Sequence, residues 1–210
     1  WPDPYRGERV QESLDQRNEL KMEDMKLLQT DVVSLPARTL IPFLNQLTFK
    51  DSLENFKKQL EHWNQKLDPT SVEAGIYVAW EDEIKKEAHK KFIPEKVKKH
   101  LKSLQLKRIL DWVENPENSP FKSYLTRNMF LKKTFENAIK KLRNTLGNDP
   151  NLWFYGQEKY KHSALSHALG AVAESETASK LNLGPFPRGG NAYTPGSTGS
   201  NKRQSSGASF

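Results

Sequence analysis

The chain is predicted to be mainly α-helical, with a loop and short β-strands confined to its C-terminal end. From Arg6 to Leu146, apolar residues recur at intervals of three or four, which is the spacing of one helix face. Beyond Leu183 this spacing disappears, and the sequence becomes rich in glycine and serine. We therefore expect a helical part, residues 1–183, followed by a Gly/Ser-rich loop and strand, residues 184–210.

The N-terminal part of the sequence predicts four helices. Glu23 and Asp24 place acidic groups in the first turn of the second helix, where the helix dipole favours them. Leu35 and Pro36 are expected to end that helix, because proline lacks the amide hydrogen that a helix interior requires. The residues that define the four helices are Arg6, Val10 and Leu14; Met25, Leu28 and Val32; Leu40 and Leu44; and Leu53, Phe56, Leu60 and Trp63.

Three longer helices are predicted farther along the chain. Thr70 and Glu73 are spaced as a capping box at the start of the first one. The second is expected over residues 97–113. Asn128 is expected to cap the third, and Gly147 to end it in a left-handed conformation. The apolar residues of the three helices are Val72, Ile76, Trp80 and Ile84; Val97, Leu101 and Leu104; and Leu131, Phe135, Ala138, Leu142 and Leu146.

The chain carries a net charge of +7, and its basic residues are concentrated in residues 85–108 and 122–143. Such patches are typical of phosphate-binding surfaces. The alternative is a solvated helix face, with Val97, Leu101 and Leu104 on the opposite side facing the core. No aromatic residues alternate with the lysines, as a single-strand-binding platform requires. We expect neither nucleic acid nor membrane as a partner, and a basic helical module that binds nucleic acid or a protein is the alternative function.

The sequence contains no pattern of a self-contained active site. It has no G-x-S-x-G motif and no phosphate-binding loop, and its lack of cysteine excludes a thiol nucleophile. Residues 81–83 are consecutive carboxylates that diverge on a helix, so we expect them on a solvated surface. His162 and His167 do not share a helix face, so each ring is expected to bond a backbone carbonyl beside Trp153 and Tyr155. We expect no catalytic residue and no metal ligand in this chain.

The two ends of the sequence suggest an internal piece of a longer protein. The chain opens on Trp1 rather than on methionine, and it stops on the apolar Phe210. The last residues resemble the beginning of a strand, so short extended segments are expected near residues 191–194 and 208–210.

Three ordered blocks of sequence carry a family resemblance. They are PYRGERV at 4–10 with MEDM at 22–25 and LQTDVVS at 28–34; HWN at 62–64 with Ser71 and Trp80; and LGNDP at 146–150, WFYG at 153–156, YKH at 160–162, SHAL at 166–169, GP at 184–185, PRGGN at 187–191 and QSSGASF at 204–210. In this order they resemble the penicillin acylases, or penicillin amidases, of the N-terminal-nucleophile hydrolase superfamily. Asn64 stands where the family usually has aspartate, Ala168 where it has proline, and Lys202–Arg203 where an acid or amide is common.

The resemblance implies a helical segment of a larger αββα enzyme that hydrolyses the linear amide bond of N-acyl substrates. In that family a serine, exposed at a new N-terminus by self-cleavage, attacks the amide carbonyl with its own α-amino group as base. The positions of this serine, of the oxyanion-stabilising groups and of the calcium ligands of some members precede Trp1. Calcium is therefore expected only in the full-length enzyme. The implied partners are the α-subunit and the N-terminal part of the β-subunit of the same precursor, and a small N-acyl amide. The implied location is periplasmic or secreted.

One position of this chain is expected to lie beside the active site. Arg6 resembles the family arginine that adjoins the active-site asparagine, and a fixed guanidinium can orient side-chain oxygens without changing its protonation state. The alternative is an ion pair between Arg6 and a carboxylate such as Asp3 or Glu12. The 210-residue chain alone is expected to be inactive.

Overall fold

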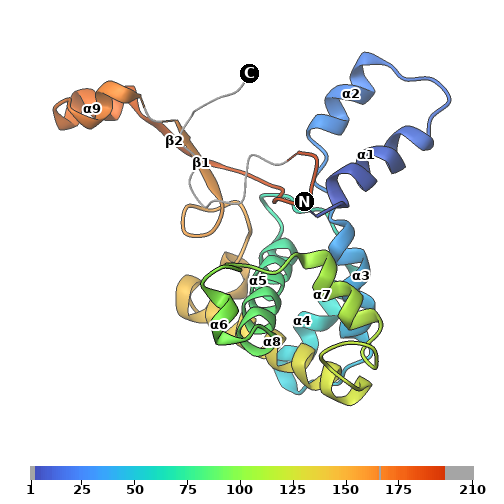
Figure 1. Ribbon diagram of the computed structural model, residues 1–210. Coiled ribbons are helices and arrows are strands. Elements are labelled where there is room, and N and C mark those ends of the chain that lie inside the picture. The colour runs from blue at the N-terminus through green and yellow to red at the C-terminus, as the bar shows by residue number, and fades with distance from the viewer. Residues whose placement is uncertain (1–2, 166, 197–210) are drawn as a thin grey trace.

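The computed structural model describes residues 3–165 and 167–196, and over these residues the chain is mainly helical with one small sheet (Figure 1). The helices are α1 (Tyr5–Asp15), α2 (Met22–Gln29), α3 (Leu35–Asn45), α4 (Asp51–His62), α5 (Val72–Phe92), α6 (Glu95–Lys98), α7 (Leu106–Glu114), α8 (Tyr124–Leu146) and α9 (Ser175–Leu181), with single 3-10 turns at Pro150–Leu152 and Ala168–Ala171. The strands are β1 (His162–Leu165) and β2 (Leu183–Pro187). The predicted fold class is confirmed. In the described part of the chain, no helix is long and apolar enough to cross a bilayer.

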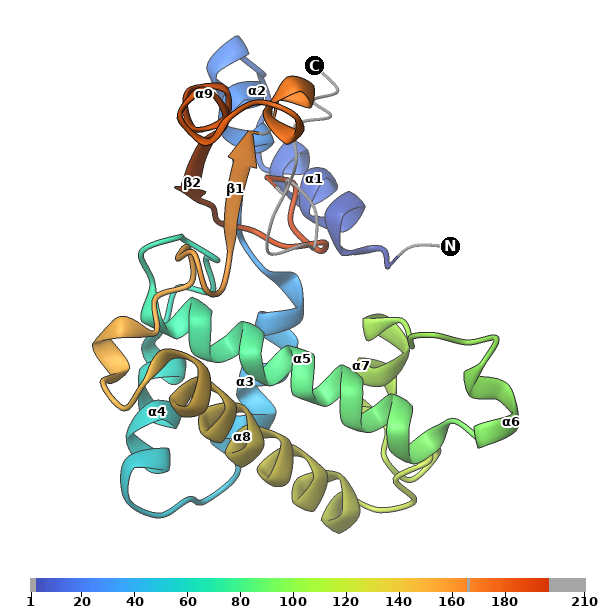
Figure 2. The same ribbon diagram turned by 90° about the vertical axis from the view of Figure 1, so that its left-hand side faces the viewer.

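Helices α5 and α8 lie against each other at the centre of the helical body, and α3, α4 and α7 pack around them (Figure 2). Trp80 of α5 is fully buried at this contact. Its indole Nε1 donates a hydrogen bond of 3.1 Å to the Thr134 hydroxyl of α8, whose side chain is also buried. The ring of Trp80 meets Phe135 edge-on at 5.6 Å between centroids. The apolar spacing that predicted these two helices is therefore the spacing of their common core.

Two predicted helix starts are displaced. Ser71, rather than Thr70, caps α5, because its hydroxyl accepts the amide of Ala74 at 3.0 Å, while the Thr70 hydroxyl bonds Asp68 at 2.7 Å. Ser123, rather than Asn128, caps α8. The predicted end of α8 is confirmed, because Gly147 adopts a φ of +96°, a conformation that favours glycine.

Leu35 and Pro36 begin α3, so the expectation that they end a helix is wrong. Ser34 caps this helix by accepting the amide of Ala37 at 3.3 Å. Proline is tolerated in a first turn because the amide it lacks would have no partner there. Helix α1 also differs from its prediction: it buries Tyr5 and Ser13, rather than a stripe that begins at Arg6.

The helix expected over residues 97–113 is interrupted. It is replaced by the short α6, a connecting segment, and α7, which begins at Leu106. The Asp3 carboxylate accepts the amides of Leu106 at 3.2 Å and Lys107 at 2.8 Å, so it supplies acceptors at the start of α7 that a preceding helical turn would otherwise provide. Val97 and Leu101 are 43% and 38% exposed, so they do not face the core as expected.

Two arms extend from the same side of the helical body (Figures 1 and 2). One is the α1–α2 hairpin, and the other consists of β1, β2 and α9. The strands are antiparallel, with His162 opposite Pro187 and Ser163 opposite Phe186. Between the arms runs the segment 188–196, which we call the strap. Residues 191–194, expected to be extended, form a turn instead, and residues 208–210 lie outside the described residues.

Candidate functional site

Arg6 lies in the first turn of α1, at the base of one arm and beside the strap. Its side chain is exposed, and its Nη2 donates to the backbone oxygen of Pro195 at 3.4 Å. The two carboxylates considered as its partners bond other groups. Asp3 accepts amides of α7, and Glu12 accepts Arg9 at 2.9 Å and Arg38 at 2.7 Å. The guanidinium of Arg6 therefore faces solvent next to the strap.

Sequence reasoning missed a second arginine on the same helix. Arg9 follows Arg6 by three residues, so the two side chains share a face of α1. Its Nε and Nη2 both donate to Oδ2 of Asp31, at 2.9 and 2.6 Å. The two side chains are only 15% and 13% exposed. The Arg–Asp pair could have been suspected from the PYRGERV and LQTDVVS blocks, in which both residues lie.

The carboxylate of Glu12 completes this charged network on the outer side of α1. Hydrogen bonds from Arg38 and then from Arg9 hold the pKa of Glu12 below its ordinary value. Guanidiniums stay protonated at any physiological pH, so the arginines of this network can orient oxygen atoms of a neighbouring group but cannot accept a proton from it.

The strap is fixed at both ends by backbone hydrogen bonds. The amide of Gly196 donates to the Asp31 carbonyl at 2.7 Å, and the amide of Gly190 donates to the Leu67 carbonyl at 2.9 Å. The hydroxyl of Tyr155 donates to the Gly190 carbonyl at 2.8 Å. A Cβ on Gly189 would lie 2.5 Å from the Leu67 oxygen, so the two consecutive glycines of the PRGGN block permit this close approach.

Beneath the strap lies a buried carboxylate on α5. Glu81 is fully buried. Its Oε1 accepts hydrogen bonds from Nζ of Lys85 at 3.2 Å and from the side-chain Nδ2 of Asn191, in the strap, at 3.4 Å. In the described residues no donor meets hydrogen-bond geometry with its Oε2, although the buried hydroxyl of Tyr77 interacts with the carboxylate. Burial raises the pKa of Glu81, and the positive charge of Lys85 opposes that rise. A hollow of about 140 Å³ adjoins Glu81 and is bordered by Tyr155 and Asn191.

The expectation that residues 81–83 are all solvated surface is therefore wrong for two of them. Glu83 is 3% exposed and pairs with Lys86 at 3.4 Å and Lys141 at 3.5 Å. Asp82 alone has a largely accessible side chain, at 44% exposure. Glu83 pairs apart from the other two, but Glu81 and Asp82 both pair with Lys85, at 3.2 and 3.0 Å, so the expected divergence of the three carboxylates holds only for Glu83.

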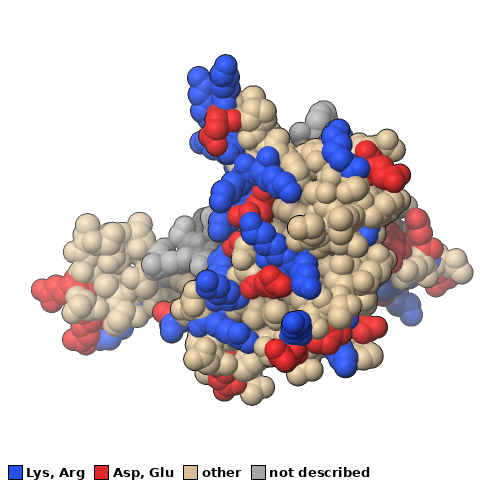
Figure 3. Space-filling view, turned by 90° about the horizontal axis from the view of Figure 1, so that it is seen from below, with Lys and Arg blue, Asp and Glu red and all other residues tan. Residues whose placement is uncertain are grey.

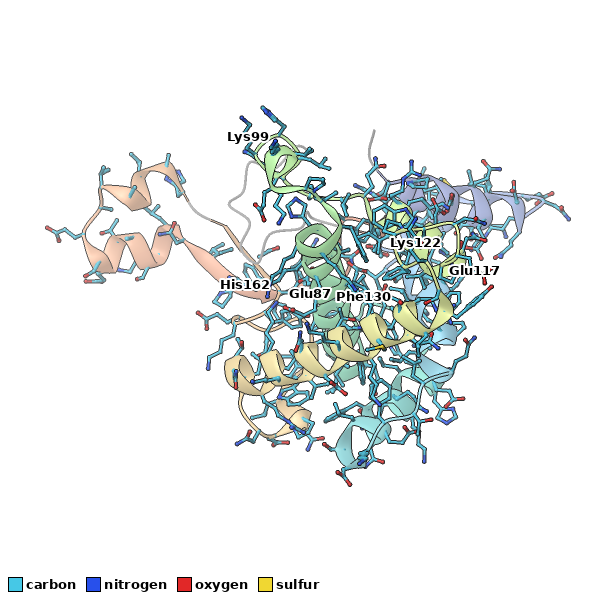
Figure 4. All side chains as sticks on the ribbon, turned by 60° about the horizontal axis from the view of Figure 1, so that its bottom comes forward. Glu87, Lys99, Glu117, Lys122, Phe130 and His162 are labelled. Carbon is cyan, nitrogen blue, oxygen red and sulfur yellow. The ribbon has the colours of Figure 1, made fainter. Side chains whose placement is uncertain are left out.

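The two histidines do not bond carbonyls beside Trp153 and Tyr155, contrary to expectation. His162 lies on β1 (Figure 4), and its Nδ1 is buried without a partner. His167 accepts the amide of Leu169 through Nδ1 at 3.1 Å. In residues 3–165 and 167–196, no group of three or more His, Asp or Glu side chains is arranged to hold a metal ion.

The basic segments form a mixed surface. Seen from below, Lys and Arg side chains are interspersed with Asp and Glu (Figure 3). Several lysines there are paired, including Lys86 and Lys141 with Glu83 and Lys98 with Glu95. Lys99 directly follows the short α6 (Figure 4).

The family model described as penicillin amidase matches residues 1–210, the whole chain. The chain belongs to the penicillin amidase family. No curated protein matches it. In this penicillin amidase chain, the PYRGERV block forms α1, the LQTDVVS block carries Asp31, and the PRGGN block leads into the strap. Three family-like blocks, distant in sequence, therefore meet around Arg6 and Arg9. Ser166 and residues 204–210 of the resembling blocks lie outside the described residues.

Proposed function

We propose that this chain is part of an amidase that hydrolyses the linear amide bond of small N-acyl compounds, of the β-lactam or acyl-homoserine lactone type. The observation that carries the proposal is the match of the penicillin amidase family to the entire chain. Members of this family hydrolyse amides, so the reaction class follows from membership, and the substrate type follows from the resemblance of the three sequence blocks.

The proposed nucleophile is an N-terminal serine that lies outside this chain and is exposed by self-cleavage of the precursor. Its hydroxyl attacks the amide carbonyl and its α-amino group accepts the proton. The amine product leaves, and water then hydrolyses the acyl-enzyme to a carboxylic acid. Donors outside this chain stabilise the negatively charged oxygen of the tetrahedral intermediates. The proposed location is the periplasm or the exterior of the cell.

Within this chain, Arg6 is the residue we propose to adjoin the active site. Its guanidinium is accessible and lies beside the strap, so it can reach an oxygen-bearing group of the neighbouring part of the enzyme. Arg9 is a second candidate for this role, because it lies on the same face of α1 as Arg6 and its guanidinium is held in place by two hydrogen bonds to Asp31. Neither side chain serves as nucleophile or base in this proposal.

The two arms support a proposal for how the chain joins the remainder of the precursor. Their large apolar side chains are exposed, which is costly for a surface that stays in water. β2 is exposed along its whole length, and an isolated two-stranded ribbon is only marginally stable. We propose that both arms pack against the α-subunit and the N-terminal part of the β-subunit, with residues 184–210 returning the chain to the central sheet. The exposed apolar residues of the arms are Leu20, Met22, Leu27, Leu169, Val172, Leu183 and Phe186.

The test is an amide-hydrolysis assay on the full-length gene product that contains this chain. A penicillin, an acyl-homoserine lactone and a chromogenic N-acyl anilide would each be followed for release of amine and carboxylic acid. N-terminal sequencing of the matured protein is expected to show a serine, and replacing that serine with alanine is expected to abolish hydrolysis. A folded, matured protein that hydrolyses no N-acyl amide would refute the proposal, as would a matured N-terminus without a nucleophilic side chain.

A further inference from the structure

We propose that Glu81 and Asn191 are positioning residues of this amidase, because together they anchor the strap that sets the places of Arg6 and Arg9. The inference rests on the proposed function, since it assigns these residues a task in amide hydrolysis. Neither residue is assigned a contact with a reacting atom, and both act through the strap and the two guanidiniums.

Asn191 organises the turn of the strap with its own polar groups. Its backbone N–H donates to the Thr194 hydroxyl at 3.0 Å, and its side-chain Oδ1 accepts the backbone N–H of Tyr193 at 2.9 Å. Both Asn191 and Thr194 are buried. One group of Asn191 then reaches outside the turn: Nδ2 donates to Glu81 of α5 at 3.4 Å. Glu81 therefore links the turn of the strap to α5.

The other end of the strap reaches both arginines within a few residues. The carbonyl of Pro195 accepts Arg6, and the amide of the next residue, Gly196, donates to the Asp31 carbonyl at 2.7 Å. The side chain of Asp31 holds Arg9. A displacement of the turn at Asn191 would therefore be transmitted along the strap to both guanidiniums.

Glu81 holds the strap at a loss of folding stability. A buried carboxylate that lacks well-formed hydrogen bonds to one of its oxygens destabilises the folded protein, even with the Tyr77 hydroxyl nearby, and an apolar side chain would avoid that loss. Its contacts with Asn191 and Lys85 give the carboxylate a specific use, which is to hold the strap. The charged groups that border the same hollow are Lys85 and Asp82 of α5 and Lys161 from the segment before β1. The titratable hydroxyls around the pair are those of Tyr77 on α5, Tyr155 and Tyr160 before β1, and Tyr193 of the strap.

The test exchanges the amide and the carboxylate in the intact amidase. Asn191→Asp places two carboxyl groups at the 3.4 Å contact, where they cannot both ionise without repulsion. We expect its kcat to fall at least about tenfold at mildly alkaline pH and to recover partly in acid, as one carboxyl takes up a proton. Adding Glu81→Gln restores an amide–carboxylate pair, and kcat of the double variant is expected within about threefold of wild type.

Two further measurements separate positioning from folding. Arg6→Ala is expected to reduce kcat less in the Asn191→Asp background than in wild type, because both changes disturb one arrangement. Asn128→Asp is the matched control: it makes the same chemical change on α8, where the new carboxylate still accepts the Arg127 guanidinium, and it is expected to leave kcat unchanged.

The outcomes are distinct. Wild-type kcat in Asn191→Asp at alkaline pH overturns the inference, and so does a loss of kcat that Glu81→Gln fails to restore. If Asn191→Asp does not accumulate as folded protein, Asn191→Ser removes the amide that reaches Glu81 without adding charge, and wild-type kcat in that variant overturns it equally. An inactive wild-type enzyme would instead contradict the proposed function, whereas an active wild type with unaffected variants contradicts only this inference.

Discussion

Arg9 and Asp31 connect the first helix to the segment before α3 through two hydrogen bonds that converge on one carboxylate oxygen, at 2.9 and 2.6 Å. The second oxygen of Asp31 accepts the amide of Val33 at 2.7 Å, and its carbonyl accepts the amide of Gly196. One aspartate thus joins α1, the segment 31–34 and the strap. The placement of the two arginines of α1 depends on this junction.

The two arginines are expected to respond differently to truncation. Arg9→Ala leaves a largely buried carboxylate without its guanidinium, so the free energy of unfolding should fall by about 1–3 kcal/mol. Arg6→Ala removes one long contact from an exposed side chain, so it should change stability by less than about 0.5 kcal/mol. It should nevertheless lower turnover or impair self-cleavage in the intact enzyme. Urea unfolding and steady-state kinetics of both variants check this. Normal kinetics and maturation in Arg6→Ala would show that Arg6 does not contribute to the active site.

Two glycines in helices provide a matched pair for the packing of α5. A Cβ on Gly75 would lie 2.0 Å from the Trp153 carbonyl oxygen, whereas a Cβ on Gly7 of α1 meets no atom within 4 Å. Gly75→Ala should therefore destabilise the protein by at least about 1–3 kcal/mol through overpacking. Gly7→Ala should stabilise it by about 0.5–1 kcal/mol, because alanine loses less backbone entropy in a helix. Thermal unfolding of both variants tests this, and equal melting temperatures would contradict the close approach at Gly75.

The hydrogen bond between α5 and α8 predicts an asymmetry between its two partners. Thr134→Val keeps the shape of the side chain but leaves the buried indole N–H of Trp80 without an acceptor, at a cost of about 1–3 kcal/mol. Adding Trp80→Phe removes that unsatisfied donor. The double variant should therefore be less destabilised than the sum of the two single variants. Denaturant unfolding of the four proteins measures this coupling, and strict additivity would argue against the bond.

The sequence predicted the long helices well because their stability comes from apolar faces, which the spacing of residues records directly. It placed the α5 cap one residue early because Thr70 and Ser71 both carry hydroxyls, and tertiary geometry decides which one is used. It predicted one helix in place of α6 and α7, because the start of α7 depends on Asp3, which is more than 100 residues away in the sequence. For the same reason it could not single out Glu81, whose strap partner Asn191 is 110 residues distant.

The family assignment and the general position of Arg6 could be inferred from sequence blocks, but the network around it could not. The contact of Arg6 with Pro195 spans 189 residues, and that of Arg9 with Asp31 depends on how α2 folds back along α1. Spacing within one helix carries no information about such pairs. They follow from the packing of the two arms and the strap on the body.

Glu81 is expected to give stability a pH dependence opposite to that of an ordinary surface-paired carboxylate. Burial, opposed by Lys85, raises its pKa above the ordinary 4.5, so the folded state binds this proton more tightly than the unfolded state. The free energy of unfolding should therefore fall as pH rises from about 4.5 through the folded-state pKa. Glu12 is the contrasting group, because hydrogen bonds from Arg38 and Arg9 lower its pKa, and its contribution is lost as pH falls.

The comparison is urea unfolding of the intact protein from about pH 4 to about pH 8 with both carboxylates varied in turn. Glu81→Gln cannot titrate, so it should lose less stability than wild type as pH rises. Glu12→Gln should instead lose less than wild type as pH falls, because the paired charge is already absent. A Glu81→Gln stability curve parallel to that of wild type would mean that this carboxyl has the same pKa in the folded and the unfolded protein, which would contradict the raised folded-state pKa.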